Sequence, residues 1–177
     1  HLARGLLDGV ADLWCSVLVG EAPLVRHLWM PEEKWMFYTA GAEVGESGHR
    51  QVQLFLRLYA WGISAVVPYW NVLGKRDWVT PDQNNIFYTG KGYAGTQKVY
   101  DGAIAGLRLK HVRRAQQDVE YAILLSACPG WDHDRVVRAL SAWAGPSPTG
   151  DRFDFTDLGL FETYRLREAL AATIEAP

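Results

Sequence analysis

The sequence predicts an α/β fold in which strands and helices alternate at first and helices alone follow. Three short apolar runs of strand type, at residues 10–19, 34–42 and 63–70, are separated by segments of helical character. From residue 103 onward, apolar residues recur at the three- and four-residue spacing of helices. Alternating strands and helices are typical of a parallel sheet covered by helices.

The segments between these strands carry helix signals. Short helices are expected before residue 10 and at residues 21–31, and a longer one at about 49–61. Gly62 suits the end of this longer helix, because glycine readily adopts the left-handed conformation found there. Pro68 lies inside the third strand and lacks a backbone N–H, so we expect a bulge or an early strand end at that point.

The second half of the chain reads as a long loop followed by helices. Residues 72–101 form the irregular segment, with one short strand expected in "NNIFYTGKGY". Three helices then follow, at residues 103–126, from an Asp132 N-cap to about residue 143, and at 157–174. We expect residues 1–145 to form one domain and residues 146–177 a linker and a helix packed on it.

Composition excludes several classes of protein. The chain has 177 residues, 49% of them hydrophobic, and a net charge of −2. That length allows one domain with a sizeable core. The basic residues are scattered apart from Lys110–Arg114, so neither a nucleic acid nor an anionic membrane is an expected partner. No apolar run is long enough for a membrane span.

Aromatic residues gather where the predicted strands end. The chain has eight Trp and eight Tyr, and aromatic rings stack on the flat apolar faces of ligands. Ligands bind at the carboxyl ends of parallel strands, although a single aromatic residue there is more often part of the core. We therefore predict a sugar-binding rim made of Trp14, Tyr38, Tyr69, Trp70, Asn71, Asp77 and Trp78.

Other motifs give weaker signals. "GKGYAG" at residues 90–95 matches a dinucleotide-binding pattern, but no convincing helix follows it, and we read it as a glycine-rich loop. The histidines lack ligand spacing, so neither a metal nor a cofactor is expected. Cys15 and Cys128 are expected to be buried free thiols. Arg108, Asp118 and Glu120 are assigned to a structural charge network, with Arg114 and Asp118 paired at i,i+4.

Four motifs follow one another in order between residues 50 and 125. They are "RLYAWGISAVVPYWNV", "DW", "NNIFYTGK" and "GAIAGLRLKHVRRAQQDVEYAILL". Together they resemble the C-terminal part of the glycoside hydrolase family 123 type of catalytic domain, and they are similar to the related domain of unknown function 4091. "ADLWCSV" is similar to an earlier strand of that family. The resemblance covers roughly residues 8–145.

The resemblance implies the C-terminal portion of a (β/α)8 TIM barrel, namely its last three strands, followed by C-terminal helices. A complete barrel takes about 250 residues, and the chain starts without an initiator methionine. We therefore expect a piece of a longer protein, with the N-terminal part of the same barrel as its missing partner. The family has an adjacent Asp-Glu pair, and no such dipeptide occurs in this chain, so no catalytic residue is assigned here.

The expected function is that of a fragment of a glycoside hydrolase, with N-acetylhexosaminides among its substrates. In this reading the chain supplies aromatic rim residues, and a carbohydrate is the ligand. Two other classes stay open: a non-catalytic carbohydrate-binding or scaffold barrel, and a nucleotide-binding α/β protein that uses residues 90–95.

Overall fold

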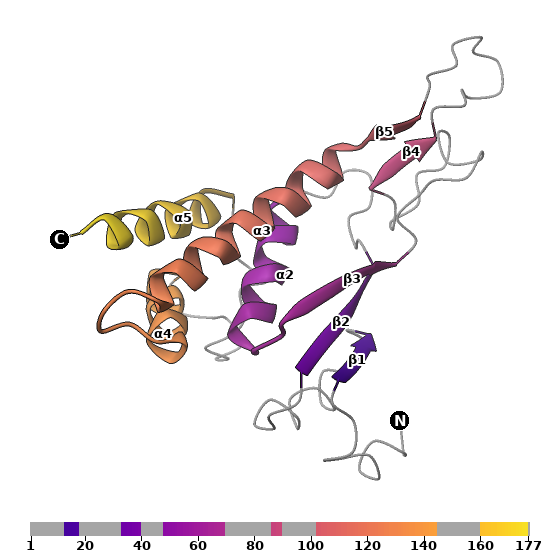
Figure 1. Ribbon diagram of the computed structural model, residues 1–177. Coiled ribbons are helices and arrows are strands. Elements are labelled where there is room, and N and C mark those ends of the chain that lie inside the picture. Colours follow the sequence, from indigo (N-terminus) through magenta and orange to yellow (C-terminus); the bar gives the residue numbers. More distant parts are fainter. Residues whose placement is uncertain are drawn as a thin grey trace.

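A computed structural model describes six segments of the chain: residues 13–17, 33–39, 48–69, 86–89, 102–144 and 160–176. Side chains are described for residues 48–64, 86–87, 102–144 and 161–176. Figure 1 shows the elements, which are β1 (Leu13–Val17), β2 (Glu33–Thr39), α2 (His49–Ala60), β3 (Ala65–Tyr69), β4 (Phe87–Thr89), β5 (Ala103–Ala105), α3 (Leu107–Ser126), α4 (His133–Ala144) and α5 (Leu160–Glu175).

Strands β1, β2 and β3 form a parallel sheet in that order. β1 and β3 lie within the strands expected from the apolar runs, and β2 begins one residue earlier than expected, at Glu33, which confirms those elements with shorter lengths. Pro68 pairs with Tyr38 in an unbroken register, so the expected bulge is absent from this pairing. Since β3 is an edge strand of the described sheet, a residue without an N–H can lie in it at little cost.

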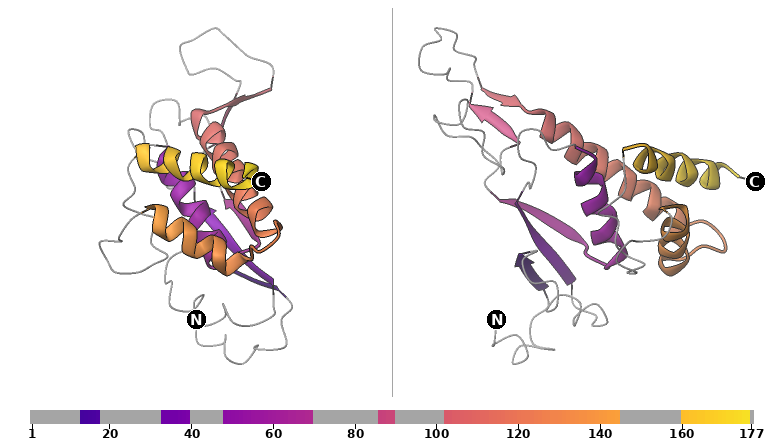
Figure 2. Two further views of the ribbon diagram at one scale, coloured as in Figure 1. Left: turned by 90° about the vertical axis from the view of Figure 1, so that its left-hand side faces the viewer. Right: turned by 180° about the vertical axis from the view of Figure 1, so that it is seen from behind.

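Helices α2 to α5 pack on one another and enclose the main core. The extensive contacts of these helices are with other helices, and α3 contacts all three of the others. Figure 2 shows the helices gathered together, with the three-stranded sheet beside them. The buried core residues are Val52, Phe55, Leu56, Tyr59, Ala60, Ala115, Ala122, Leu125, Val136, Val137, Leu140, Leu166 and Leu170.

The predicted α/β class and the TIM-barrel portion are wrong for the part of the chain that the structure describes. Helices make up 76% of the residues whose side chains are described, which indicates a helical fold. In a barrel each helix covers neighbouring strands, whereas here the apolar faces of the helices meet each other. The described sheet also has only three strands and therefore two open edges, rather than a closed ring.

The helix expected from residue 103 begins later. Ala103–Ala105 instead forms strand β5, which pairs antiparallel with β4, and α3 begins at Leu107. Two glycines explain the difference: Gly102 has a φ of 90°, and Gly106 is an extended N-cap residue with φ −77° and ψ 166°. The β4 strand confirms the short strand expected in the long loop.

The predicted helix ends are confirmed at two places. Gly62 has a φ of 68°, and the Gly62 and Ile63 N–H groups donate to the carbonyls of Tyr59 and Leu58, which ends α2 sharply. Asp132 caps α4, since its Oδ1 accepts a hydrogen bond of 2.6 Å from the Arg135 N–H. The short helices expected before residue 10 and at residues 21–31 lie outside the described residues.

Candidate functional site

The predicted rim residues are only partly placed together. Tyr38 pairs with Pro68 and Thr39 with Tyr69, so Tyr38 and Tyr69 lie one register step apart at the carboxyl ends of β2 and β3. Trp14 pairs instead with Lys34, four positions before Tyr38. At about 3.3 Å per residue, this separates Trp14 from the rim by roughly 13 Å along the sheet.

The register therefore brings two of the seven predicted rim residues to one edge and leaves Trp14 near the opposite end of its strand. The other four, Trp70, Asn71, Asp77 and Trp78, lie outside the described residues, as does the glycine-rich loop at 90–95.

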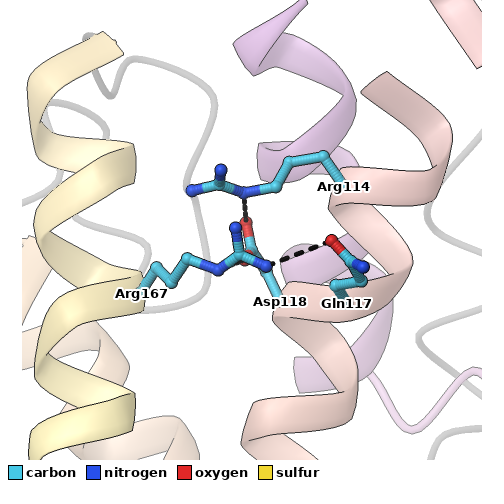
Figure 3. A network of polar contacts seen from close by, with 4 residues as sticks. All are labelled: Arg114, Gln117, Asp118 and Arg167. Atoms are coloured by element: carbon cyan, nitrogen blue, oxygen red, sulfur yellow. Dashed lines mark hydrogen bonds and ion pairs between the residues drawn. The ribbon is translucent and has the colours of Figure 1, made fainter. Parts of the chain in front are cut away.

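The most elaborate polar arrangement among the described side chains joins α3 to α5 (Figure 3). Asp118 on α3 is 2% exposed, and its Oδ2 accepts a hydrogen bond of 3.2 Å from the Arg114 Nε one turn earlier. From α5, the Arg167 Nε lies 2.9 Å from Asp118 Oδ1. The Arg167 Nη2 also donates to Gln117 Oε1 at 3.2 Å. We call these four residues the carboxylate clamp.

Two tyrosines extend the carboxylate clamp. The Arg114 guanidinium lies 4.8 Å from the ring centre of Tyr164 on α5, and the Arg167 guanidinium lies 5.4 Å from the ring centre of Tyr121 on α3. Each arginine therefore contacts both the buried carboxylate and an aromatic face, and such cation–π contacts add to the attraction between the two helices.

Two opposing effects act on the pKa of Asp118 in the carboxylate clamp. Burial raises the pKa of Asp118, because the charged form loses water, while Arg114 and Arg167 favour the charged form. Asp118 Oδ1 makes its ion pair with Arg167 but no well-aligned hydrogen bond. The two arginines therefore offset the desolvation of the carboxylate only in part.

The clamp holds helices together rather than performing chemistry. Both oxygens of Asp118 face guanidinium groups, and the carboxylate is closed to solvent, so it has no open position for a substrate proton. This agrees with the assignment of Asp118 to a charge network. The sequence indicated Arg114 through its i,i+4 spacing, but it gave no sign of Arg167, because that contact joins two separate helices.

A second polar joint connects three helices at Tyr59. The Tyr59 hydroxyl donates to the Ala122 carbonyl on α3 at 3.4 Å, and His133 Nε2 of α4 donates to the Tyr59 carbonyl at 2.9 Å. The two rings lie 4.8 Å apart, centre to centre. Burial raises the pKa of Tyr59, while a hydrogen bond with Ser126 lowers it. This joint fixes α2 against α3 and α4.

The start of α2 lies directly against α3. A Cβ added to Gly48 would meet the His111 ring, so glycine is required there for close approach rather than for its backbone angle. Burial lowers the pKa of His49, and the positive charges of Arg50 and His111 lower it further. His49, Arg50 and His111 therefore lie close together where α2 meets α3.

No cluster of three or more potential metal ligands occurs within the residues that the structure describes. Within the same residues, no helix is long and apolar enough to cross a membrane. Cys128 is a free thiol, as expected, but it is half-buried rather than buried, and it donates to the Leu124 carbonyl at 3.4 Å.

Comparisons with known proteins do not place the chain in a family. No family model matches it, and no curated protein matches it either.

Proposed function

We propose that the chain supplies a carbohydrate-binding edge to a protein that hydrolyses glycosidic bonds. The observation that carries this proposal is the register of the parallel sheet, which brings Tyr38 and Tyr69 to the carboxyl ends of adjacent strands. Trp70 and Asn71 follow Tyr69 directly in the sequence. Aromatic rings next to an amide suit a sugar, since its faces are apolar and its rim carries hydroxyl groups.

A second observation supports the proposal. The motif that resembles the glycoside hydrolase family implies a helix over "LRLKHVRRAQQDVEYAILL", and α3 spans Leu107–Ser126. The Asp of that motif is Asp118, the centre of the carboxylate clamp. The Asp of the motif therefore has a structural role in this chain, because its contacts help to hold α5 on α3.

The proposed division of labour follows from the residues present. The aromatic edge would bind and orient a sugar, and stacking of a ring on the sugar would displace water and so strengthen the hydrogen bonds of the sugar hydroxyl groups. Glycoside hydrolysis needs two carboxyl groups, or one together with an acetamido group of the substrate. We assign no catalytic carboxyl group to this chain, so the acid would come from another part of the protein.

Titration calorimetry with N-acetylhexosamine oligosaccharides tests the proposal. Tyr69→Ala should weaken binding about three- to tenfold, because one stacked ring contributes about 0.5–1.5 kcal/mol. The matched control is Trp143→Ala, which removes an aromatic ring that is 37% exposed on α4. Equal binding by both variants, or no binding by the unaltered chain, would contradict a sugar site at this edge.

A non-catalytic carbohydrate-binding protein is the second candidate, and the same sheet edge supports it. Release of nitrophenol from aryl N-acetylhexosaminides by the full-length protein separates the two. Sugar binding without any release would favour the non-catalytic function.

A further inference from the structure

Asp118 brings two arginine side chains from different helices to one place. The Arg114 Nε of α3 lies 3.2 Å from Asp118 Oδ2, and the Arg167 Nε of α5 lies 2.9 Å from Asp118 Oδ1. Two positive charges therefore share one negative charge, which leaves one positive charge in excess. Among the described residues, no other acid pairs with either arginine. The remaining acids of α3 and α5 are all exposed, and they are Glu120, Glu162, Glu168 and Glu175.

Both arginines keep hydrogen-bond donors that face no acceptor. Each arginine meets the carboxylate with its Nε, and the Arg167 Nη2 donates to Gln117 Oε1. The two Nη groups of Arg114 and the Nη1 of Arg167 make no hydrogen bond to the part of the chain that the structure describes. Figure 3 shows the terminal nitrogens of Arg114 turned away from Asp118. The side chains of Arg114 and Arg167 are 27% and 23% exposed, so solvent reaches both of them.

Aromatic contacts hold the two guanidinium groups in place. Tyr164 of α5 contacts the guanidinium of Arg114 on α3, and Tyr121 of α3 contacts that of Arg167 on α5. Each arginine is thus fixed by a carboxylate and by a ring, before any ligand arrives. Because a fixed side chain loses less conformational freedom on binding, an anion can bind to it at a smaller entropic cost.

We propose that Arg114 and Arg167 bind a tetrahedral oxyanion, the group that phosphate and sulfate esters share. Guanidinium N–H groups form charge-assisted hydrogen bonds with the oxygens of such anions. Since the two arginines extend from different helices, their free donors approach from two directions, which suits oxygens in a tetrahedral arrangement. Tyr164 is 48% exposed beside Arg114 and offers an apolar face to a ring that carries the anion.

Nuclear magnetic resonance of the arginine Nε–Hε groups tests the site in the unaltered protein. Titration with sodium phosphate or sodium sulfate should shift the signals of Arg114 and Arg167 until they saturate, in at least one of the two salts. Sodium chloride and sodium acetate at equal ionic strength should shift them less, because neither anion is a tetrahedral oxyanion. Equal shifts in all four salts, or equal shifts at the exposed Arg165 of α5, would overturn the proposal.

A matched pair of variants tests the same site by titration calorimetry with phenyl phosphate. Arg114→Gln should weaken binding about tenfold or more, because it removes one charged donor group. Arg165→Gln makes the same change at an exposed residue of α5 and should alter binding less than about twofold. An equal loss in both variants would refute the site. Circular dichroism checks the fold, and the spectra of the unaltered protein decide the question if Arg114→Gln does not fold.

Two tyrosine variants separate the possible sources of the anion and the two proposed sites. Tyr164→Ala should weaken binding of phenyl phosphate more than that of inorganic phosphate, since only the ester carries a ring. Equal effects on both ligands would overturn the role of Tyr164. The oxyanion site lies on α3 and α5, whereas the proposed sugar site lies on β2 and β3. Tyr69→Ala should therefore leave phosphate binding unchanged, even if it shows that the sugar site is wrong.

Discussion

The two halves of helix α3 differ sharply. In the C-terminal half, Asp118, Ala122 and Leu125 are buried, and the residues around them contact α2, α4 and α5. In the N-terminal half, Leu107 is 71% exposed, and Lys110 and Arg113 are exposed as well. One helix thus anchors the core at one end and presents charge at the other. The stability of the protein should therefore depend more on buried residues of the C-terminal half of α3 than on exposed residues of its N-terminal half.

The largest expected difference in stability is between variants of two leucines, one in each half of α3. Leu125→Ala should reduce the free energy of unfolding by about 2–5 kcal/mol, because it leaves a cavity in the core. Leu107→Ala makes the same chemical change at an exposed position and should cost less than about 0.5 kcal/mol. Urea denaturation followed by circular dichroism measures both. Similar losses in the two variants would mean that the halves are not distinct.

The carboxylate clamp should respond unequally to loss of either partner. Arg167→Met should cost about 3 kcal/mol, because it leaves the Asp118 carboxylate buried with one cation fewer. Asp118→Asn should cost less than about 1 kcal/mol, since it removes the buried charge itself. The double variant should recover most of the loss caused by Arg167→Met. Additive losses in this cycle would contradict the clamp.

The pH dependence of stability follows from the same carboxylate. Burial raises the folded-state pKa of Asp118 above its ordinary value of 3.8. Its contribution to stability is therefore fully present below that value and is lost as pH rises through the raised pKa. Arg167→Met removes a cation and raises that pKa further, so its deficit should grow with rising pH and shrink toward acid. A deficit that does not change with pH would mean that Asp118 is not the titrating group.

The packing of the N-terminal half of α3 against the start of α2 is tested at Gly48. Gly48→Ala should destabilise the protein by about 1–3 kcal/mol, because the added methyl group meets the His111 ring. His111→Ala opens that space, so the double variant should be more stable than Gly48→Ala alone. Thermal unfolding of the three variants measures the coupling. A Gly48→Ala protein as stable as the unaltered one would show that the helices can move apart.

The smallest expected effect on the free energy of unfolding is a gain rather than a loss. Lys110→Glu should stabilise the protein by about 0.3–1 kcal/mol, since it places an acid near the positive end of the α3 dipole and removes a like-charge contact. Arg138→Glu makes the same charge change in the middle of α4 and should have no such benefit. Differential scanning calorimetry at low salt compares them. A loss of stability in Lys110→Glu would mean that Lys110 already has a stabilising partner.

Local patterns were sufficient for much of the secondary structure. Apolar runs located β1, β2 and β3, helical spacing located α2, and single residues such as Gly62 and Asp132 marked helix ends correctly. These features depend on neighbouring residues alone, so they can be seen in a sequence.

The sequence could not show how these elements pack. An apolar helix face is the same whether it covers a sheet or another helix, so α2 and α3 fitted a barrel as well as the helical core that they form. The rim prediction grouped Trp14 with Tyr38 because both lie on strands, but only the register shows that Trp14 pairs near the start of β2. The carboxylate clamp could not be predicted in full, because Arg167 forms its hydrogen bond with Gln117, which lies 50 positions earlier in the sequence.

The joint at Tyr59 also affects how the chain folds during synthesis. The Tyr59 carbonyl can accept its hydrogen bond only after His133 has been synthesised, 74 positions later in the chain. At about 5–20 residues per second, a ribosome needs roughly 4–15 s to add that length. For most of this interval the apolar residues of α2 lack a complete helical partner, because α3, which packs most extensively on α2, is complete only at Ser126. The nascent chain therefore exposes an apolar segment, and chaperones that bind such segments should raise the yield of folded protein.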